Sequence, residues 1–93
     1  MVWKIISSET FSKEFKKYRR DGEFLRALNN KIKKLQENPE SVGGYLSGRL
    51  HGYKSTRIVN KLRLVFKIFY EKKEVHLMGI DHRKFGYDGF NFN

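Results

Sequence analysis

The chain has 93 residues, of which 39% are hydrophobic and 15% aromatic, so we expect one domain over residues 1–93 and exclude a disordered chain. Its formal net charge is +10, from 20 Lys and Arg against 10 Asp and Glu; this excess favours a polyanionic partner such as nucleic acid, an acidic protein or an anionic membrane surface. The absence of cysteine excludes disulfides and thiolate metal sites.

The beginning of the chain predicts a strand followed by a helix. Residues 2–7 are apolar and β-branched, which is typical of a short strand. Ser7 or Ser8 can then cap a helix, and Glu9 lies near the positive end of its dipole. The apolar residues of this helix recur at helical spacing and form one stripe: Phe11, Phe15 and Tyr18.

A second helix follows the break at Asp21-Gly22, where the Asp21 side chain can cap it. This helix ends at Asn38-Pro39, because the residue before a proline is pushed out of the α region. The short connection predicts that the two helices are antiparallel. The apolar face of the second helix comprises Leu25, Leu28, Ile32 and Leu35.

The second half of the chain predicts a loop and then three strands. Residues 40–52 hold four glycines and are typical of a loop. Residues 53–59 and 61–70 form a hairpin that turns near Asn60-Lys61, and residues 74–80 form the next strand. Within the hairpin one face is apolar, formed by Leu62, Leu64, Phe66 and Ile68. The order β-α-α-β-β-β predicts an α+β fold in which an antiparallel sheet packs on two helices.

The register of this hairpin decides which basic residues share a face. A two-residue loop at Asn60-Lys61 would place Lys54 opposite Lys67, so that Lys54 and Arg63 lie on the face away from the apolar row. They would then be about 13 Å apart along the strands, and their long side chains could converge on one phosphate. An odd loop length would turn Lys54 toward the core.

The charge is unevenly distributed along the chain. Between Ser41 and Tyr70 there are six basic residues and no acidic residue, which suggests a surface that meets phosphate; chance combined with general solubility is the alternative. The N-terminal segment lacks the apolar stretch of a signal peptide, and no apolar run approaches the ~18 residues of a membrane span. We therefore expect a cytoplasmic protein. Three histidines far apart in sequence predict no metal site, and we expect no cofactor.

Three motifs in the second half carry a resemblance to a known family. The first is Leu46–Lys54 (LSGRLHGYK) followed by Arg57-Ile58, the second is Lys61–Phe66 (KLRLVF), and the third is Ile80–Tyr87 (IDHRKFGY). In this order and spacing they resemble the RelE/ParE superfamily of toxins, and the RelE family in particular. The element order and the chain length are also similar, so the resemblance covers essentially the whole chain.

This resemblance implies both an activity and its residues. RelE-like toxins are metal-independent, ribosome-dependent endoribonucleases that cleave mRNA, and ungapped matching puts the cleavage roles on Lys54, Arg63, Arg83 and Tyr87. Thr56 stands where these toxins have a second lysine, and Arg57 beside it is a candidate substitute. Further candidates for RNA binding are Arg49, Lys61 and Lys67.

These residue types suit cleavage in which the 2′-OH attacks the phosphodiester. Arg63 and Arg83 can stabilise the negative charge of the transition state, because a guanidinium matches phosphate and stays protonated. Lys54 can stabilise charge or accept the 2′-OH proton, and Tyr87 can stack on a base or donate a proton. His82 is a rival acid or base, because an ordinary histidine titrates near neutral pH.

Two other functions and one partner follow from the same resemblance. ParE-like toxins share the fold but poison DNA gyrase, and a non-catalytic nucleic-acid-binding module is the third reading. A toxin of either branch implies a cognate antitoxin, and the positive charge of this chain predicts an acidic, partly helical, RelB-like one in a hetero-oligomer. The ribonuclease would also need the ribosome and mRNA as partners.

Overall fold

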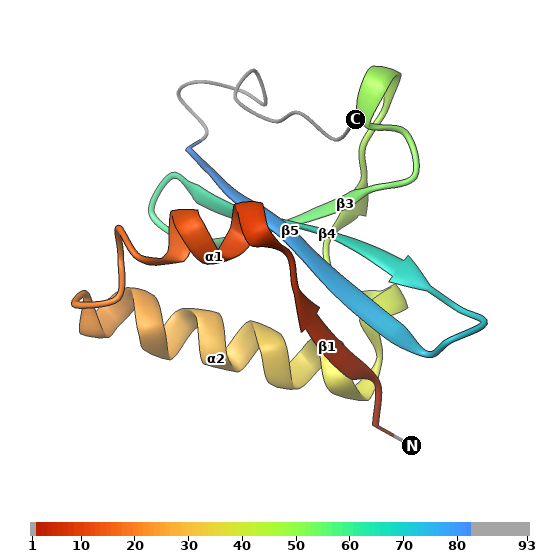
Figure 1. Cartoon of the computed structure of the whole chain (residues 1–93), viewed down its shortest axis with the longest axis horizontal. Coiled ribbons are helices and arrows are strands. Elements are labelled where there is room, and N and C mark those ends of the chain that lie inside the picture. The colour runs from red at the N-terminus through yellow and green to blue at the C-terminus, as the bar shows by residue number, and fades with distance from the viewer. Residues whose placement is uncertain (1, 83–93) are drawn as a thin grey trace.

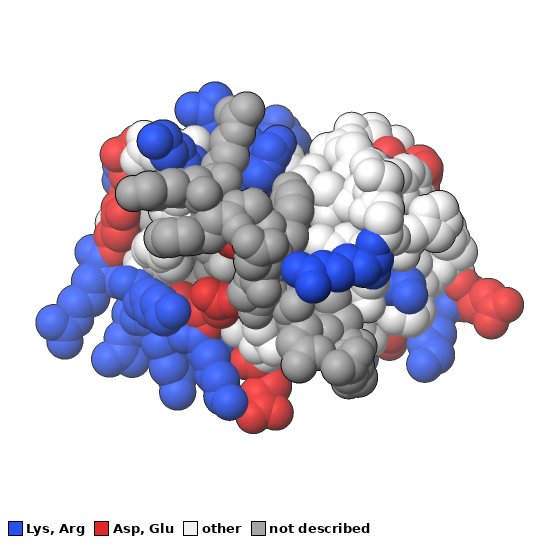
Figure 2. Space-filling model, turned by 90° about the horizontal axis from the view of Figure 1, so that it is seen from above, with Lys and Arg blue, Asp and Glu red and all other residues white. Residues whose placement is uncertain are grey.

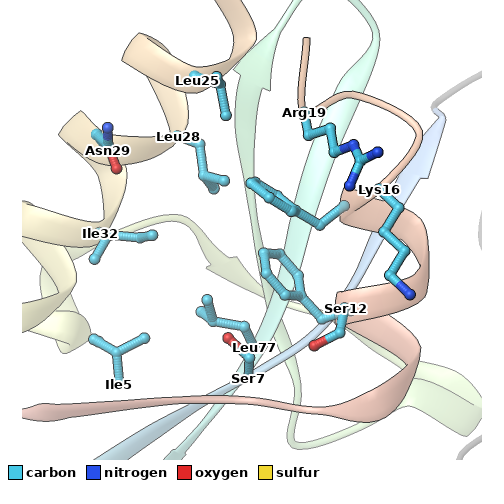
Figure 3. A pocket seen from close by; sticks show the side chains of 12 residues that line it. Ile5, Ser7, Ser12, Lys16, Arg19, Leu25, Leu28, Asn29, Ile32 and Leu77 are labelled. Atoms are coloured by element: carbon cyan, nitrogen blue, oxygen red, sulfur yellow. The ribbon is translucent and has the colours of Figure 1, made fainter. Parts of the chain in front are cut away.

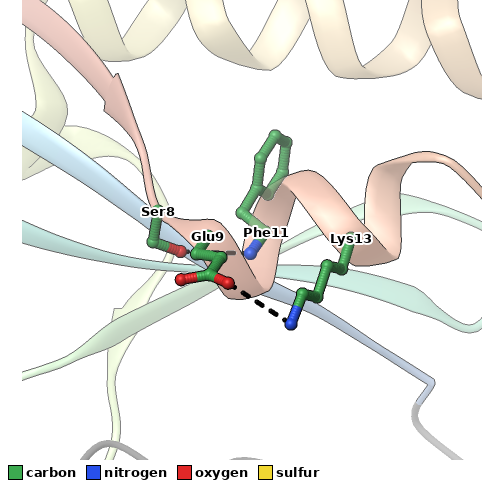
Figure 4. Close-up of polar contacts among 4 residues, drawn as sticks. All are labelled: Ser8, Glu9, Phe11 and Lys13. Atoms are coloured by element: carbon green, nitrogen blue, oxygen red, sulfur yellow. Dashed lines mark hydrogen bonds and ion pairs between the residues drawn. The ribbon is translucent and has the colours of Figure 1, made fainter.

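The first helix begins where the sequence predicted and ends earlier. The computed structural model of the chain describes residues 2–82, and in it α1 spans Glu9–Phe15. The Ser8 hydroxyl accepts a hydrogen bond from the backbone N–H of Phe11 at 3.1 Å, and Lys13 pairs with Glu9 one turn earlier at 3.3 Å (Figure 4). Tyr18 lies beyond the helix in a turn, yet its ring still packs on Phe24, 4.9 Å between centroids. Tyr18 therefore still packs with the apolar side chains of the predicted stripe, although it lies outside the helix.

The second helix, α2, spans Gly22–Glu37 and matches the prediction at both ends. Asp21 Oδ1 accepts a hydrogen bond from the N–H of Phe24 at 3.2 Å, which satisfies a backbone donor that the first turn of a helix leaves unpaired. Pro39 follows the helix and begins a short 3-10 turn, η1 (Pro39–Ser41). The side chains that α2 buries most completely are Phe24, Leu28 and Leu35. None of the helices within residues 2–82 is long and apolar enough to span a membrane.

Five strands form one sheet, with both helices on the same face (Figure 1). The strands are β1 (Lys4–Ser7), β2 (Gly44–Tyr45), β3 (Lys54–Val59), β4 (Leu62–Phe69) and β5 (Glu74–His82), in the order β1-β5-β4-β3-β2. The α+β class and the two helices packed on a sheet are confirmed. The expectation of a purely antiparallel sheet is wrong, because β1 pairs with β5 in parallel. Two parallel strands need a crossover connection between them. Here the chain that joins β1 to β5 begins with α1 and α2.

The short edge strand β2 lies in the stretch that the sequence predicted as loop. It pairs with β3 through Gly44 and Tyr45. Gly43, just before it, has φ +64°, and a Cβ at this position would lie 2.1 Å from the backbone oxygen of Ser55. Only glycine fits there. A second 3-10 turn, η2 (Gly48–Leu50), leads from β2 toward β3.

The core lies between the helices and one face of the sheet. The apolar row predicted on β4 is buried on this helix-facing side, with 0% of Leu64 and Phe66 exposed and 8% of Leu62 and Ile68. Residues that alternate with this row point to the opposite side, which we call the outer face. Val65 on the outer face is also 0% exposed.

Candidate nucleic-acid interface

The β3–β4 hairpin has the predicted turn but not the predicted register. Val59 pairs with Leu62 across a two-residue loop, and Asn60 in that loop adopts the left-handed conformation, φ 54°. One residue further, the pairing shifts at Ile58, so that Arg57 lies opposite Arg63. An irregularity of this kind places one extra residue in a strand and changes the face of everything beyond it. The predicted pairings of Ile58 with Arg63 and of Lys54 with Lys67 are therefore wrong.

As a consequence Lys54 lies on the helix-facing side of the sheet, opposite Phe66. Its side chain is 2% exposed. The Nζ donates hydrogen bonds to the backbone oxygens of Glu40 at 2.7 Å and Pro39 at 3.4 Å, and it lies 4.9 Å from the centre of the Tyr45 ring. The prediction that Lys54 and Arg63 share a face is wrong, and the contacts of Lys54 attach η1 and β2 to the sheet.

A hydrogen-bonded cluster covers this lysine at the edge of the molecule. The hydroxyls of Tyr45 and Tyr70 lie 2.9 Å apart, and both donate to the carboxylate of Glu40. The hydrogen bond to Glu40 raises the pKa of Tyr70 well above its ordinary value, because removing the proton would place a second negative charge beside the carboxylate. The ring of Trp3 meets that of Tyr70 edge to face. These residues hold the end of the sheet together.

The outer face carries a row of charged residues across three neighbouring strands. Arg57 on β3 lies opposite Arg63 on β4, and Arg63 lies opposite Asp81 on β5. Arg57 is exposed, and its Nε donates to the backbone oxygen of Asn60 at 3.0 Å. The Nε of Arg63 is buried and has no hydrogen-bond partner within residues 2–82. The two opposed arginines repel each other, and Asp81 supplies one negative charge against their two. The row therefore keeps an excess of positive charge and is the strongest candidate for a phosphate site among the described residues.

Asp81 is the residue of this row that the sequence did not single out. The predicted last strand stopped at Ile80, whereas β5 continues to His82. Two more residues of strand bring Asp81 into the sheet and onto the outer face, 7% exposed. Alternation from Glu74 would have placed Asp81 on the helix-facing side with Val75. Instead Leu77 pairs with Phe66 and Gly79 with Val65, so the pairing skips Met78 and every later residue of β5 changes face. His82, the next residue, lies opposite Leu62 on the helix-facing side of the sheet.

A second cluster lies further along the outer face. Lys67 is four residues beyond Arg63 on β4, about 13 Å along the strand, and lies opposite His76 on β5. The Lys67 Nζ lies 5.1 Å from the centre of the Tyr53 ring and 5.4 Å from that of Phe69. His76 stacks on Phe69 at 4.3 Å between centroids. The aromatic contacts hold the ammonium of Lys67 at a defined position on the outer face.

The same cluster contains one acid. His76 Nε2 lies 3.0 Å from Glu74 Oε1. This hydrogen bond is the largest cause that lowers the pKa of Glu74 below its ordinary value. The carboxylate of Glu74 is thus engaged by the neighbouring imidazole on its own strand.

The remaining candidates from the sequence are scattered. Arg49 is exposed in η2, and Lys61 is exposed in the β3–β4 turn. Thr56 is buried on the helix-facing side opposite Leu64, so its position on β3 does not face the arginine row. Arg83 and Tyr87 lie outside the described residues.

An apolar groove opens on the helix side of the sheet, where β1, α1 and α2 meet (Figure 3). Its volume is about 510 Å³. Lys16 and Arg19 lie at its rim, and both are exposed. The apolar side chains that line it are Ile5, Phe11, Phe15, Leu25, Leu28, Ile32 and Leu77.

Basic side chains are concentrated beside this groove. Figure 2 shows Lys and Arg gathered at the end of the molecule that holds the connection between α1 and α2. The basic residues of that segment that are exposed are Lys13, Lys16, Lys17, Arg19 and Arg20. The groove therefore combines an apolar floor with a positive rim.

Several solved structures share the fold of this chain. No family model matches the sequence, and no curated protein sequence matches it. The toxin–antitoxin complex RelBE2 of Mycobacterium tuberculosis contains a chain that is 24% identical, with a TM-score of 0.73 over 89% of this chain and 100% of that one. The YoeB dimer of Staphylococcus aureus is 22% identical, with a TM-score of 0.72 over 88% and 98%.

A third neighbour is the toxin RelE of E. coli, solved as a mutant in the free state. It is 18% identical and covers 92% of this chain and 88% of its own, with a TM-score of 0.70. The similarity covers most of this chain and most of each of the three proteins, so they share its overall fold. The resemblance seen in the sequence motifs is confirmed at the level of the fold: this chain has the fold of the RelE/ParE superfamily of toxins.

Proposed function

We propose that this chain is the toxin of a type II toxin–antitoxin system and acts in the cytoplasm as a ribosome-dependent endoribonuclease. It cleaves mRNA by attack of the 2′-OH and so inhibits translation. The observation that carries the proposal is the opposed pair Arg57 and Arg63 on the outer face, where the buried Nε of Arg63 has no hydrogen-bond partner in residues 2–82. A phosphate held by the two guanidiniums would offset their positive charge.

The chemistry follows from where the charge develops. Attack of the 2′-OH gathers negative charge on the phosphoryl oxygens, and losing one preorganised donor at such a site typically costs about 3–4 kcal/mol of transition-state stabilisation. Arg63 and Arg57 supply guanidinium donors without needing a metal ion. By the resemblance to RelE-like toxins, Arg83 would add a third cation, and Tyr87 would stack on a base or donate a proton.

The RNA would run along the outer face rather than across the helices. Lys67 lies on the same strand as Arg63 and is held between aromatic rings, so it can bind a phosphate further along the RNA from the scissile one. Arg49 and Lys61 are exposed and would add electrostatic attraction that depends on salt. Lys54 and His82 lie on the other side of the sheet and take no part in this proposal.

Primer extension on a translated message after induction tests the proposal. Wild-type protein should give cuts within codons that vanish when translation is blocked, and Arg63→Ala should abolish both the cuts and the growth arrest while the protein remains folded. Arg26→Ala, which removes an exposed arginine from α2, is the matched control and should leave both unchanged.

Three outcomes would count against the ribonuclease. Full toxicity of Arg63→Ala would exclude the arginine row as its site. Intact messages with DNA damage would instead indicate a ParE-like gyrase poison. Binding of RNA that weakens steeply with salt, without any cut, would indicate a non-catalytic nucleic-acid-binding module.

The partner that restrains the toxin is, on this proposal, an acidic RelB-like antitoxin in a hetero-oligomer. Two of the structural neighbours are a RelBE2 complex and a heterotetrameric YoeB–YefM complex, and the groove between α1 and α2 has the apolar floor and basic rim that suit an acidic amphipathic segment. Replacing Lys16 and Arg19 with Glu should weaken binding of a co-expressed antitoxin about tenfold, and the affinity of this variant should fall less with added salt than that of wild type. Unchanged affinity would exclude this groove.

A further inference from the structure

We infer that Asp81 is the general base of the proposed cleavage, the group that takes the proton from the attacking 2′-OH. The inference rests on the proposed function and adds a residue that neither the motifs nor the family resemblance assigns. It starts from the position of Asp81 directly opposite Arg63 on the outer face.

The sheet places Asp81 close to both arginines. Opposed residues on neighbouring strands have Cβ atoms roughly 5 Å apart, and Arg57, Arg63 and Asp81 occupy three successive strands of the sheet. A phosphodiester held by the Arg63 guanidinium therefore lies within reach of the Asp81 carboxylate. Asp81 is 7% exposed, so its charge acts in a setting from which most water is excluded.

Among the described residues, no other base lies beside the arginines. Lys54 points to the helix-facing side, and so does His82. His76 does lie on the outer face, but it is opposite Lys67, about 13 Å along β4 from the level of Arg63, and it is engaged with Glu74. Within residues 2–82, Asp81 is the one side chain in the arginine row that can accept a proton.

The surroundings of Asp81 are cationic on the side of β4 and β3. The charged and titratable described side chains that share the outer face with it are Arg57 on β3, Arg63 and Lys67 on β4, Glu74 and His76 on β5 and Lys4 on β1. Arg63 and Arg57 attract the Asp81 carboxylate, so that it faces the row as a hydrogen-bond acceptor. Their positive charge also offsets the negative charge of a phosphate that approaches Asp81. A carboxylate beside an unshielded phosphate would repel it.

The Asp81 carboxylate accepts the proton of the 2′-OH, the 2′ oxygen forms a bond to phosphorus, and the bond from phosphorus to the 5′ oxygen breaks. Arg57 and Arg63 hold the non-bridging oxygens. The 5′ oxygen takes a proton from water, and the hydroxide so formed removes the proton from Asp81. The products are a 2′,3′-cyclic phosphate and a 5′-hydroxyl end.

Single-turnover cleavage of a ribosome-bound message tests the assignment. Asp81→Asn should lower the first-order rate constant by about 100- to 10,000-fold, the usual contribution of general acid–base catalysis, while the affinity for the ribosome stays within threefold. The shape of the pH profile separates a base from a positioning residue. In wild type the rate should level off toward neutral pH. In Asp81→Asn it should keep rising tenfold per pH unit, because hydroxide must then remove the proton.

Controls keep the outcomes distinct. Asp81→Glu, which retains the carboxylate, should recover part of the rate, and circular dichroism during thermal unfolding shows whether each variant is folded. A profile of unchanged shape in Asp81→Asn, or a rate within threefold of wild type, overturns the assignment and leaves the ribonuclease standing. A wild-type protein that cuts no message overturns both.

Discussion

The burial of Lys54 makes a quantitative prediction that separates a structural from a catalytic role. Lys54→Ala removes a side chain that is 2% exposed and leaves the backbone oxygen of Glu40 without its 2.7 Å hydrogen bond. The three buried methylenes beyond Cβ account for about 2 kcal/mol at ~0.8 kcal/mol each, and the charge-assisted hydrogen bond for about 1.5–3 kcal/mol. The cost of desolvating the ammonium offsets several kcal/mol of this. We expect a net destabilisation of about 2–4 kcal/mol.

Lys54→Met separates the contribution of the buried methylenes from that of the ammonium group. It retains most of the stem on Phe66 and removes the ammonium, so it should cost about 1–2 kcal/mol, less than the alanine variant. Lys61→Ala, at an exposed position of the β3–β4 turn, is the matched control and should remain within ~0.5 kcal/mol of wild type. Urea unfolding followed by circular dichroism measures all three.

A Lys54→Ala variant whose free energy of unfolding lies within about 0.5 kcal/mol of wild type, and which yet loses all toxicity, would contradict a structural role for Lys54. That result would mean that Lys54 acts on substrate and that the hairpin register places it on the outer face. Loss of toxicity in step with the loss of stability, partly rescued by Lys54→Met, would instead support the buried position.

The remaining predictions concern the arginine row, a helix cap and a titration. Arg57→Ala should lower the cleavage rate by about 100-fold or more. Arg49→Ala should change only the salt-dependent affinity for RNA, by an amount near one phosphate contact. Equal effects of the two variants on the cleavage rate would contradict a site at the arginine row. Asp21→Ala should destabilise the fold by about 0.5–2 kcal/mol through loss of the α2 cap, and a urea midpoint equal to wild type would show that the 3.2 Å hydrogen bond to Phe24 contributes nothing. His76→Ala should raise the pKa of Glu74 toward its ordinary value of 4.5, as measured by NMR titration. The wild-type pair contributes stability above that value and loses it as the pH falls through the lowered pKa, so a pKa that does not move would exclude the hydrogen bond.

Local rules were sufficient for the helices and for the core. Ser8 and Asp21 cap α1 and α2 because a side-chain oxygen next to the first turn can accept its free N–H groups. Pro39 ends α2 by a steric clash within two residues. The row from Leu62 to Ile68 is buried because strand side chains alternate and only one face meets the helices. Each of these outcomes depends on neighbours in the sequence.

The composition of the candidate site depended on contacts that no local pattern contains. One shift at Ile58 moved Lys54 from the outer face to the interior and brought Arg57 opposite Arg63, because a period of two makes the face of every later residue depend on a single extra one. The parallel pairing of β1 with β5 and the extension of β5 to Asp81 likewise depend on partners far away in the chain. The sequence by itself predicted that basic residues would lie on one face of the sheet. The tertiary structure decided which of them share that face.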